Sequence, residues 1–203
     1  MQPLRNEIIE EQKSILSTVI LGENSSVTKT KLVQPERSNP LWQVLLDELA
    51  VIFEGELELI FPAEWNKHYF EWFHSMEKIG FRQELHYSFE ELAAALQNPE
   101  LVFWFFTVDG QPQILLFGYS SLDEQKKAFY LDTFAVKRRS EGIGNIVLKL
   151  LIRWAKTKKF HSIVLDTEVK DEKGFPLQHF YAQHGFETVS ISEKGDIIMK
   201  HRL

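Results

Sequence analysis

Three consecutive basic residues, Lys137–Arg139, precede a turn that contains Gly142 and Gly144 and opens a helical pattern. Glycines let the backbone approach an anion closely, and the free N–H groups of a first helical turn point toward it. A helix terminus contributes about 0.3–1 kcal/mol toward an anion at an exposed site. A basic side chain such as Arg139 would add to this attraction. The pattern therefore predicts a phosphate-binding site at the start of a helix.

Two common phosphate-binding motifs do not fit this turn. The P-loop string G-x-x-x-x-G-K-[ST] does not occur in the sequence. The dinucleotide fingerprint requires a third glycine, but Val147 occupies that position and belongs to the apolar face of the helix. What remains is the pattern R-x-x-G-x-G, formed by Arg139, Gly142 and Gly144, between a strand-like run and a helix.

The composition is that of an acidic protein with a large apolar core. The chain has 203 residues, of which 44% are hydrophobic, and a formal net charge of −6. A nucleic-acid-binding protein is normally basic, so we expect no nucleic-acid partner. The absence of cysteine excludes disulfides and thiolate chemistry. Neither a signal peptide nor a long apolar segment is recognisable, so we expect a soluble, cytoplasmic protein without membrane association.

The histidines give no indication of a metal centre. None of the seven has a spacing typical of metal ligands. His179 and His184, for example, are five residues apart and do not share a helix face. We therefore expect no metal site.

The first part of the chain is expected to be mainly helical. Asn39 and Pro40 are typical of a helix start, and the apolar spacing that follows predicts a helix ending near Gly55. Aromatic residues at helical spacing predict a second helix from about Trp65, with Gly80 at its end. We expect the aromatic stripe to pack in the core, and the alternative is that part of it walls a substrate pocket.

The second part alternates strands and helices. Ser88 and Glu91 form a capping box that opens a short helix. Strands are then predicted at 101–108, 113–122 and 126–136, a helix from about 143, a strand at 162–169, a short helix at 176–185 and a closing pair of strands. This order predicts an α/β or α+β domain.

A second motif lies downstream of the glycine turn, after the next predicted strand. Phe180 and Tyr181 begin the run F-Y-x-x-x-G-F, which ends at Gly185 and Phe186. The strand, R-x-x-G-x-G, helix, strand and F-Y-x-x-x-G-F together resemble the GNAT superfamily of acetyl-CoA-dependent N-acetyltransferases. The resemblance implies a mixed central sheet of about six to seven strands, splayed after the fourth and flanked by helices. It covers residues 30–203, the expected single domain, and leaves 1–29 as an N-terminal extension of unassigned role.

The resemblance implies that the phosphate belongs to acetyl-CoA (coenzyme A), the acyl donor. The loop around the pyrophosphate would comprise Arg139, Ser140, Glu141, Gly142, Ile143, Gly144 and Asn145. Phe134, Ala135 and Val136 would pair their backbone with the pantetheine arm. Ser140 and Glu141 depart from the family pattern, and we expect the Glu141 carboxylate to point to solvent because it would repel phosphate.

The resemblance also implies catalytic roles. Tyr181 stands where many relatives place the general acid, because a phenol can protonate the thiolate leaving group. Asp132 is the candidate base, directly or through a water, and Glu168 is its competitor. The backbone N–H of Phe134 would polarise the carbonyl oxygen. Purely structural roles for Tyr181 and Asp132 are the alternative.

The function implied is transfer of an acetyl group from acetyl-CoA to a primary amine, by direct attack in a ternary complex. The acceptor could be a small molecule or a peptide, and a homodimer is compatible with the sequence. We expect the substrate pocket to be lined by the helices between residues 40 and 80 and by the strand at 113–122. The alternative functions are a non-catalytic acyl-CoA-binding sensor or interaction module, and transfer of a longer acyl group.

Overall fold

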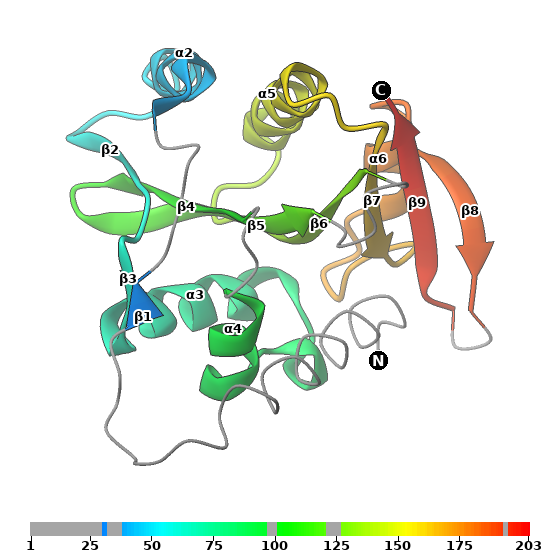
Figure 1. Ribbon diagram of the computed structural model, residues 1–203, viewed down its shortest axis with the longest axis horizontal. Helices are drawn as coiled ribbons and strands as arrows, with labels where there is room; N and C mark the ends of the chain where they lie inside the picture. Colours follow the sequence, from blue (N-terminus) through cyan, green and yellow to red (C-terminus); the bar gives the residue numbers. More distant parts are fainter. Residues whose placement is uncertain (1–29, 32–37, 97–100, 121–126, 193–194) are drawn as a thin grey trace.

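The computed structural model describes residues 30–31, 38–96, 101–120, 127–192 and 195–203. Its centre is a seven-stranded sheet in the order β2-β4-β5-β6-β7-β9-β8 (Figure 1). The strands are β2 (Leu57–Ile60), β4 (Leu101–Val108), β5 (Gln111–Ser120), β6 (Ala128–Val136), β7 (Ser162–Thr167), β8 (Glu187–Ile191) and β9 (Ile197–Arg202). Only the β6–β7 pairing in this sheet is parallel. The predicted mixed sheet is confirmed, and the proposed extension at 1–29 lies outside the described residues.

Helices cover both faces of the sheet (Figure 1). Helices α2 (Pro40–Leu49) and α5 (Ile143–Thr157) lie on one face, while α3 (Lys67–Gly80) and α4 (Phe89–Ala95) lie on the other. Short elements complete the fold: β1 (Thr30–Lys31) pairs with β3 (Glu64–Trp65), η2 (Gln83–Leu85) follows α3, and α6 (Leu177–Ala182) follows β7. The arrangement gives three layers with two separate apolar clusters, one on each side of the sheet.

The first helix starts as predicted and ends earlier. The side chain of Asn39 accepts a hydrogen bond from the N–H of Leu41 at 3.1 Å, and Pro40 is the first helical residue. The helix stops at Leu49, not near Gly55. The chain then leads into β2, an edge strand that pairs with β4 and that the sequence pattern did not predict.

The second helix begins at Lys67, because Asn66 caps it by accepting a hydrogen bond from the N–H of Tyr69. Trp65 therefore belongs to β3 and not to the helix. The stripe packs mainly in the core as expected, since Trp65, Phe73 and Met76 are all buried.

The predicted capping box at the start of α4 is confirmed. The Ser88 hydroxyl accepts a hydrogen bond from the N–H of Glu91, and the Glu91 carboxylate accepts one from the N–H of Ser88. This cap fixes where the chain enters α4, directly after Tyr87, whose side chain reaches the site described below.

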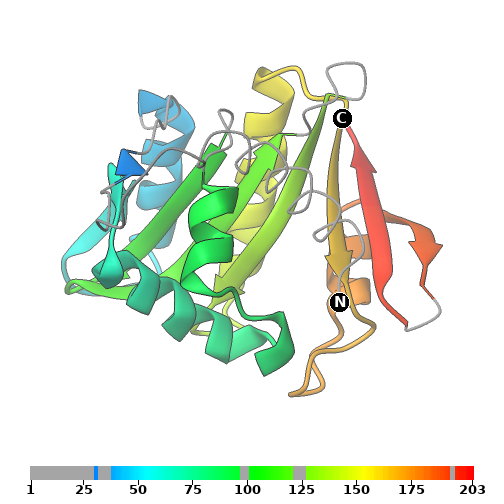
Figure 2. The ribbon, with the colours of Figure 1, turned by 60° about the horizontal axis from the view of Figure 1, so that its bottom comes forward.

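The sheet opens between its fourth and fifth strands. β6 pairs with β7 only from Ala128 to Tyr130, opposite residues 162–164, and the two strands then separate (Figure 2). Within β6, Leu131 pairs with Gly118 and Thr133 pairs with Phe117, so Asp132 is the extra residue of a β-bulge. The predicted splay after the fourth strand is therefore confirmed, and the bulge lies where it begins.

Candidate active site

A cavity of about 330 Å³ lies where β6 and β7 separate. This volume falls within the range of small-molecule pockets, about 300–1,000 Å³. Its walls come from the Gly80–Leu85 segment, the second half of β6, the start of α5, the end of β7 with the loop after it, and α6. Five separate segments of the chain thus meet at the open edge of β6.

Most of the residues predicted for the site line this cavity, whereas the predicted walls were partly wrong. Asp132, Tyr181, Glu168 and the predicted donor-binding residues line it, with the exception of Glu141. The segment 40–79 and strand β5 do not contribute to its lining. Helix α2 packs against α5 on one face of the sheet, and the aromatic stripe of α3 faces the core, so neither reaches the opening.

The glycine turn has the backbone form expected of an anion site. Gly142 is the N-cap of α5 with φ of +79°, a conformation that favours glycine, and no atom lies within 4 Å of the place where a Cβ would stand. A Cβ on Gly144 would come within 3.2 Å of the Phe180 ring. Glycine is therefore required at the two positions for different reasons. Gly142 forms the turn and leaves the space beside it open, whereas Gly144 lets α6 pack against α5.

The two arginine side chains before this turn are already engaged. Arg138 forms an ion pair with Glu141 and lies 4.7 Å from the centre of the Phe53 ring. Both partners of this pair are partly exposed, which agrees with the expectation that the Glu141 carboxylate points away from a bound phosphate. Arg139 forms an ion pair with Asp171.

The Arg139 guanidinium also donates a hydrogen bond to the Ile79 carbonyl at 3.1 Å. Its position fastens the end of α3 to the turn before α5. Because its charge is balanced by Asp171, the backbone N–H groups of the turn, more than the Arg139 side chain, are left to bind an anion.

Asp171 is a site residue that the sequence analysis missed. Its side chain is only 4% exposed. One carboxylate oxygen accepts hydrogen bonds from the N–H groups of Lys173 and Phe175, both at 2.9 Å, while the other contacts Arg139. The D-x-x-G spacing of Asp171 and Gly174 is typical of such a turn and was the available signal.

The second half of β6 offers backbone groups to the opening. The N–H of Lys137 donates a hydrogen bond to the carbonyl of Gln113 in β5 at 2.8 Å. Because N–H groups alternate between the two sides of a strand, those of Phe134 and Val136 point the other way, toward the side that β7 has left. An extended ligand could pair with this edge as an added strand.

Asp132 accepts hydrogen bonds from three hydroxyl groups at the bulge. Tyr87 donates to Oδ2 at 2.8 Å, Tyr119 donates to the same oxygen at 3.1 Å, and Thr133 donates to Oδ1 at 2.8 Å. Burial, followed by the charge of Asp132, raises the pKa of Tyr119 well above its usual value. Tyr119 therefore remains a neutral donor, and the three hydroxyl groups orient the carboxylate at the cavity wall. Sequence spacing gave no indication of Tyr87 or Tyr119.

Tyr181 lies on α6 and is 8% exposed. Burial raises its pKa above the usual phenol value. Within the part of the chain that the structure describes, its hydroxyl makes no hydrogen bond, and its ring contacts Phe180 and Phe186. The hydroxyl is therefore a neutral donor at the cavity.

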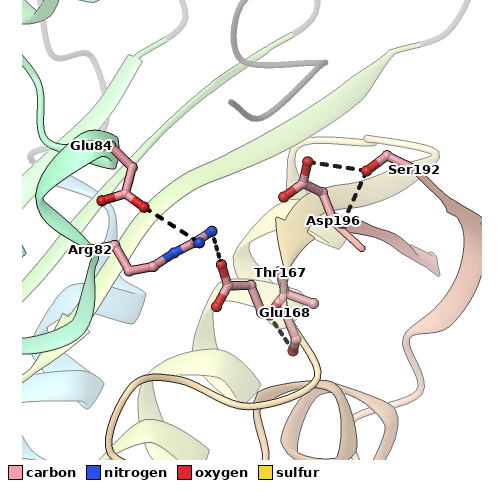
Figure 3. A network of polar contacts seen from close by, with 6 residues as sticks. All are labelled: Arg82, Glu84, Thr167, Glu168, Ser192 and Asp196. Carbon is pink, nitrogen blue, oxygen red and sulfur yellow. Dashed lines mark hydrogen bonds and ion pairs between the residues drawn. The ribbon is translucent and has the colours of Figure 1, made fainter. Parts of the chain in front are cut away.

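Glu168 follows β7 and contacts Arg82, which also lies 3.4 Å from Glu84 (Figure 3). The pair crosses from the segment after α3 to the end of β7. The Glu168 carboxylate is therefore held by a cation at the cavity wall, whereas the Asp132 carboxylate is oriented by the hydroxyl groups of Tyr87, Tyr119 and Thr133.

The sequence model of the acetyltransferase (GNAT) family matches residues 58–186. A comparison with curated proteins finds no sequence match. None of the helices in the described ranges is both long and apolar enough to cross a bilayer.

Solved structures resemble the fold at low sequence identity. The ribosomal-protein-S18-alanine N-acetyltransferase of Escherichia coli is 14% identical with a TM-score of 0.55, covering 72% of this chain and 94% of its own. The PaiA N-acetyltransferase of Thermoplasma acidophilum, in complex with coenzyme A, is 15% identical with a TM-score of 0.56, covering 73% and 99%. An aminoglycoside 6′-acetyltransferase type Ii is 17% identical with a TM-score of 0.57, covering 72% and 96%.

Proposed function

Because the chain belongs to the acetyltransferase (GNAT) family, whose model matches well over half of it, we propose that it transfers an acetyl group from acetyl-CoA to a primary amine. The reaction is direct attack of the amine on the thioester in a ternary complex. The observation that carries the proposal is on β6: the outward N–H of Phe134 and the Asp132 carboxylate lie two residues apart at the same cavity.

The donor would lie along the open edge of β6 with its pyrophosphate at the start of α5. The N–H groups of the first helical turn, which follow Gly142, supply the donors for the phosphate oxygens. Phe134 and Val136 supply backbone donors for the pantetheine arm. A solved relative of the same fold is described in complex with coenzyme A, which supports this placement.

A residue of the site can be assigned to each step of the reaction. Asp132, directly or through one water, takes a proton from the acceptor ammonium, and the freed nitrogen attacks the thioester carbon. The N–H of Phe134 stabilises the negative charge that develops on the carbonyl oxygen. The carbon–sulfur bond then breaks and leaves a thiolate. The attacking nitrogen loses its second proton as the amide forms, and this proton neutralises the thiolate. The Tyr181 hydroxyl donates a hydrogen bond to the departing sulfur.

The raised pKa of Tyr181 refines its role. A phenol above its usual pKa is a poorer acid than a thiol, whose ordinary pKa is about 8.5. Complete proton transfer from Tyr181 to the thiolate would therefore be uphill. A hydrogen bond to the departing sulfur needs no such transfer, and this is the contribution we assign to Tyr181.

The acceptor would approach from the side of Arg82 and Glu168. Glu172 also lines the cavity, and a carboxylate there suits a cationic amine. Related structures are described as an acetyltransferase for an alanine of ribosomal protein S18 and one for an aminoglycoside, and both classes of amine belong in a screen.

A second function, binding of an acyl-CoA without catalysis, is favoured by one observation. The carboxylate of Asp132 already accepts three hydrogen bonds from side-chain hydroxyl groups, which gives it a structural role at the bulge that requires no proton transfer. The two functions differ in turnover and not in donor binding.

Acetyl transfer measured by thiol release, with a panel of amines and peptides, tests the proposal. We expect amine-dependent release of coenzyme A by the wild-type chain, with the acetylated amine identified by mass spectrometry. Release that no amine accelerates, together with intact acetyl-CoA binding, would favour the binding module. Donors with longer acyl chains, tested in the same assay, define the acyl preference.

A further inference from the structure

A cluster of two histidines and a buried carboxylate lies outside the cavity. His74 and Glu77 are on α3, and His86 follows η2. One nitrogen of each ring and one oxygen of Glu77 all lie within 4.8 Å of one another among the described residues. We propose that these three side chains bind a divalent transition-metal ion of the zinc type.

The donor set matches that chemistry. Imidazole nitrogen and carboxylate oxygen are common zinc ligands, and two histidines with one glutamate leave a fourth position for water. Two ligand atoms that each lie about 2.0–2.2 Å from one tetrahedral zinc ion are about 3.3–3.6 Å apart. His74 Nδ1 lies 3.6 Å from Glu77 Oε2, so this pair already has the separation that a shared zinc ion requires.

Burial and hydrogen bonds give the cluster the features of a built site. Glu77 is 1% exposed, and burying a carboxylate is costly unless charge or hydrogen bonds compensate it. Its Oε1 accepts a hydrogen bond from the N–H of Tyr87 at 3.1 Å. The ring of His86 is oriented by the Phe81 carbonyl, 3.1 Å from Nε2. Partners of this kind, which hold metal ligands in place, are typical around metal sites.

A metal ion at this site would stabilise the side of the cavity from which the acceptor approaches in the proposed function. Between its helical ligands and His86 runs the segment that contains Phe81, Arg82 and Leu85, which line the cavity. Directly after His86, Tyr87 joins Glu77 through its backbone and Asp132 through its hydroxyl. A metal held by this cluster would fix both the segment and the tyrosine that orients Asp132.

The sequence analysis missed this cluster because it compared the histidines only with one another. His74 and Glu77 have the i, i+3 spacing that places two side chains on one helix face. The third ligand comes from beyond the end of the helix, and only the fold brings it there.

Zinc chloride titrated into the full-length protein, after removal of metals with a chelator, tests the proposal. We expect about one equivalent to bind by calorimetry and metal analysis, as one cluster requires. His74→Ala and His86→Ala should each weaken binding by at least about 10- to 100-fold, the loss typical of disturbing even the outer partners of a metal site. Magnesium, which prefers oxygen ligands and water, should bind far more weakly.

His179→Ala is the matched control, because this histidine is on α6, outside the cluster. It should leave zinc binding unchanged. His86→Asn, which keeps a polar side chain, replaces His86→Ala if that variant does not fold in the absence of metal. Unchanged affinity in the His74 and His86 variants, or no binding by the wild type, would overturn the proposal.

Hydrogen exchange supplies a second readout. Zinc should slow amide exchange in residues 81–88 of the wild type and of His179→Ala, but not of the His74 and His86 variants. Slower exchange in all four proteins, or in none, would contradict a metal site at this cluster.

Discussion

Arg82 and Glu168 form an ion pair that joins the segment after α3 to the end of β7 beside the cavity (Figure 3). Arg139 and Asp171 form a second pair between the turn before α5 and the loop after β7. Both cross the separation that begins after Tyr130. The opening is therefore held by paired charges and not by strand hydrogen bonds, which allows ligands to take up the backbone groups of β6.

Glu168→Gln and Arg82→Gln test the role of the first pair. Their side chains are 31% and 37% exposed, so each change should cost no more than about 1 kcal/mol of unfolding free energy. We expect both to raise KM for the amine with little change in donor affinity, as measured by steady-state kinetics and calorimetry. A fall in kcat for Glu168→Gln alone would instead identify Glu168 as the base.

Asp132→Asn tests the candidate base. Asparagine keeps the size of the side chain and one oxygen acceptor, but it cannot take a proton from the amine. We expect kcat to fall by about 10²- to 10⁴-fold, the usual contribution of a general base, while acetyl-CoA still binds. Glu168→Gln serves as the carboxylate control. Turnover that survives Asp132→Asn would remove this residue from the mechanism.

Gly142→Ala tests the glycine turn. Gly142 and Gly110 have φ of +79° and +70°, and a Cβ added to either would meet no atom within 4 Å. Alanine at either position should cost about 1–2 kcal/mol of stability through backbone strain. Only Gly142→Ala should also weaken acetyl-CoA binding, because Gly110 lies in the β4–β5 turn, away from the cavity. Equal donor affinity in the two variants would show that the turn does not hold the donor.

Tyr181→Phe separates stability from catalysis. The pKa of Tyr181 is raised in the folded protein, so the folded state keeps its proton above the usual phenol pKa of about 10, where the unfolded state loses it. The stabilisation is thus fully present below about pH 10 and is lost as pH rises further, by up to about 1.4 kcal/mol per pH unit.

Urea unfolding between pH 8 and pH 11 tests this predicted loss of stability with rising pH. We expect the wild type to lose stability faster than Tyr181→Phe above about pH 10, and the two proteins to run parallel below it. At neutral pH the variant should bind acetyl-CoA normally and turn over more slowly, because the donor to the departing sulfur is gone. Parallel curves over the whole range would mean that the phenol is not shielded from solvent.

The sequence predicted the parts of the site that depend on local backbone form. The glycine turn before α5 and the position of Tyr181 on α6 follow from short motifs in fixed order, and the splay of the sheet after β6 was implied by the family that these motifs resemble. Capping residues such as Asn39 and Ser88 fixed helix starts for the same local reason.

The contacts that surround those motifs were not predictable in this way. Tyr87 reaches Asp132 across 45 residues of sequence, and Arg139 reaches Ile79 across 60. Nothing in the spacing of these residues marks them as partners. The expectation that helices from residue 40 onward line the pocket failed because the apolar face of α2 packs on α5. Long-range side-chain pairing and layer packing are set by the whole fold.

The most direct test of the account is a thermal-shift titration of the protein with acetyl-CoA and coenzyme A, with ATP and NAD as controls. At a concentration about 100 times the dissociation constant, a ligand stabilises the folded state by about 2.7 kcal/mol. For a chain of this size this corresponds to a rise in Tm of roughly 5–11 °C. The account predicts that rise with the two coenzyme A species alone. No rise, or an equal rise with ATP, would contradict a donor site at the opening of the sheet.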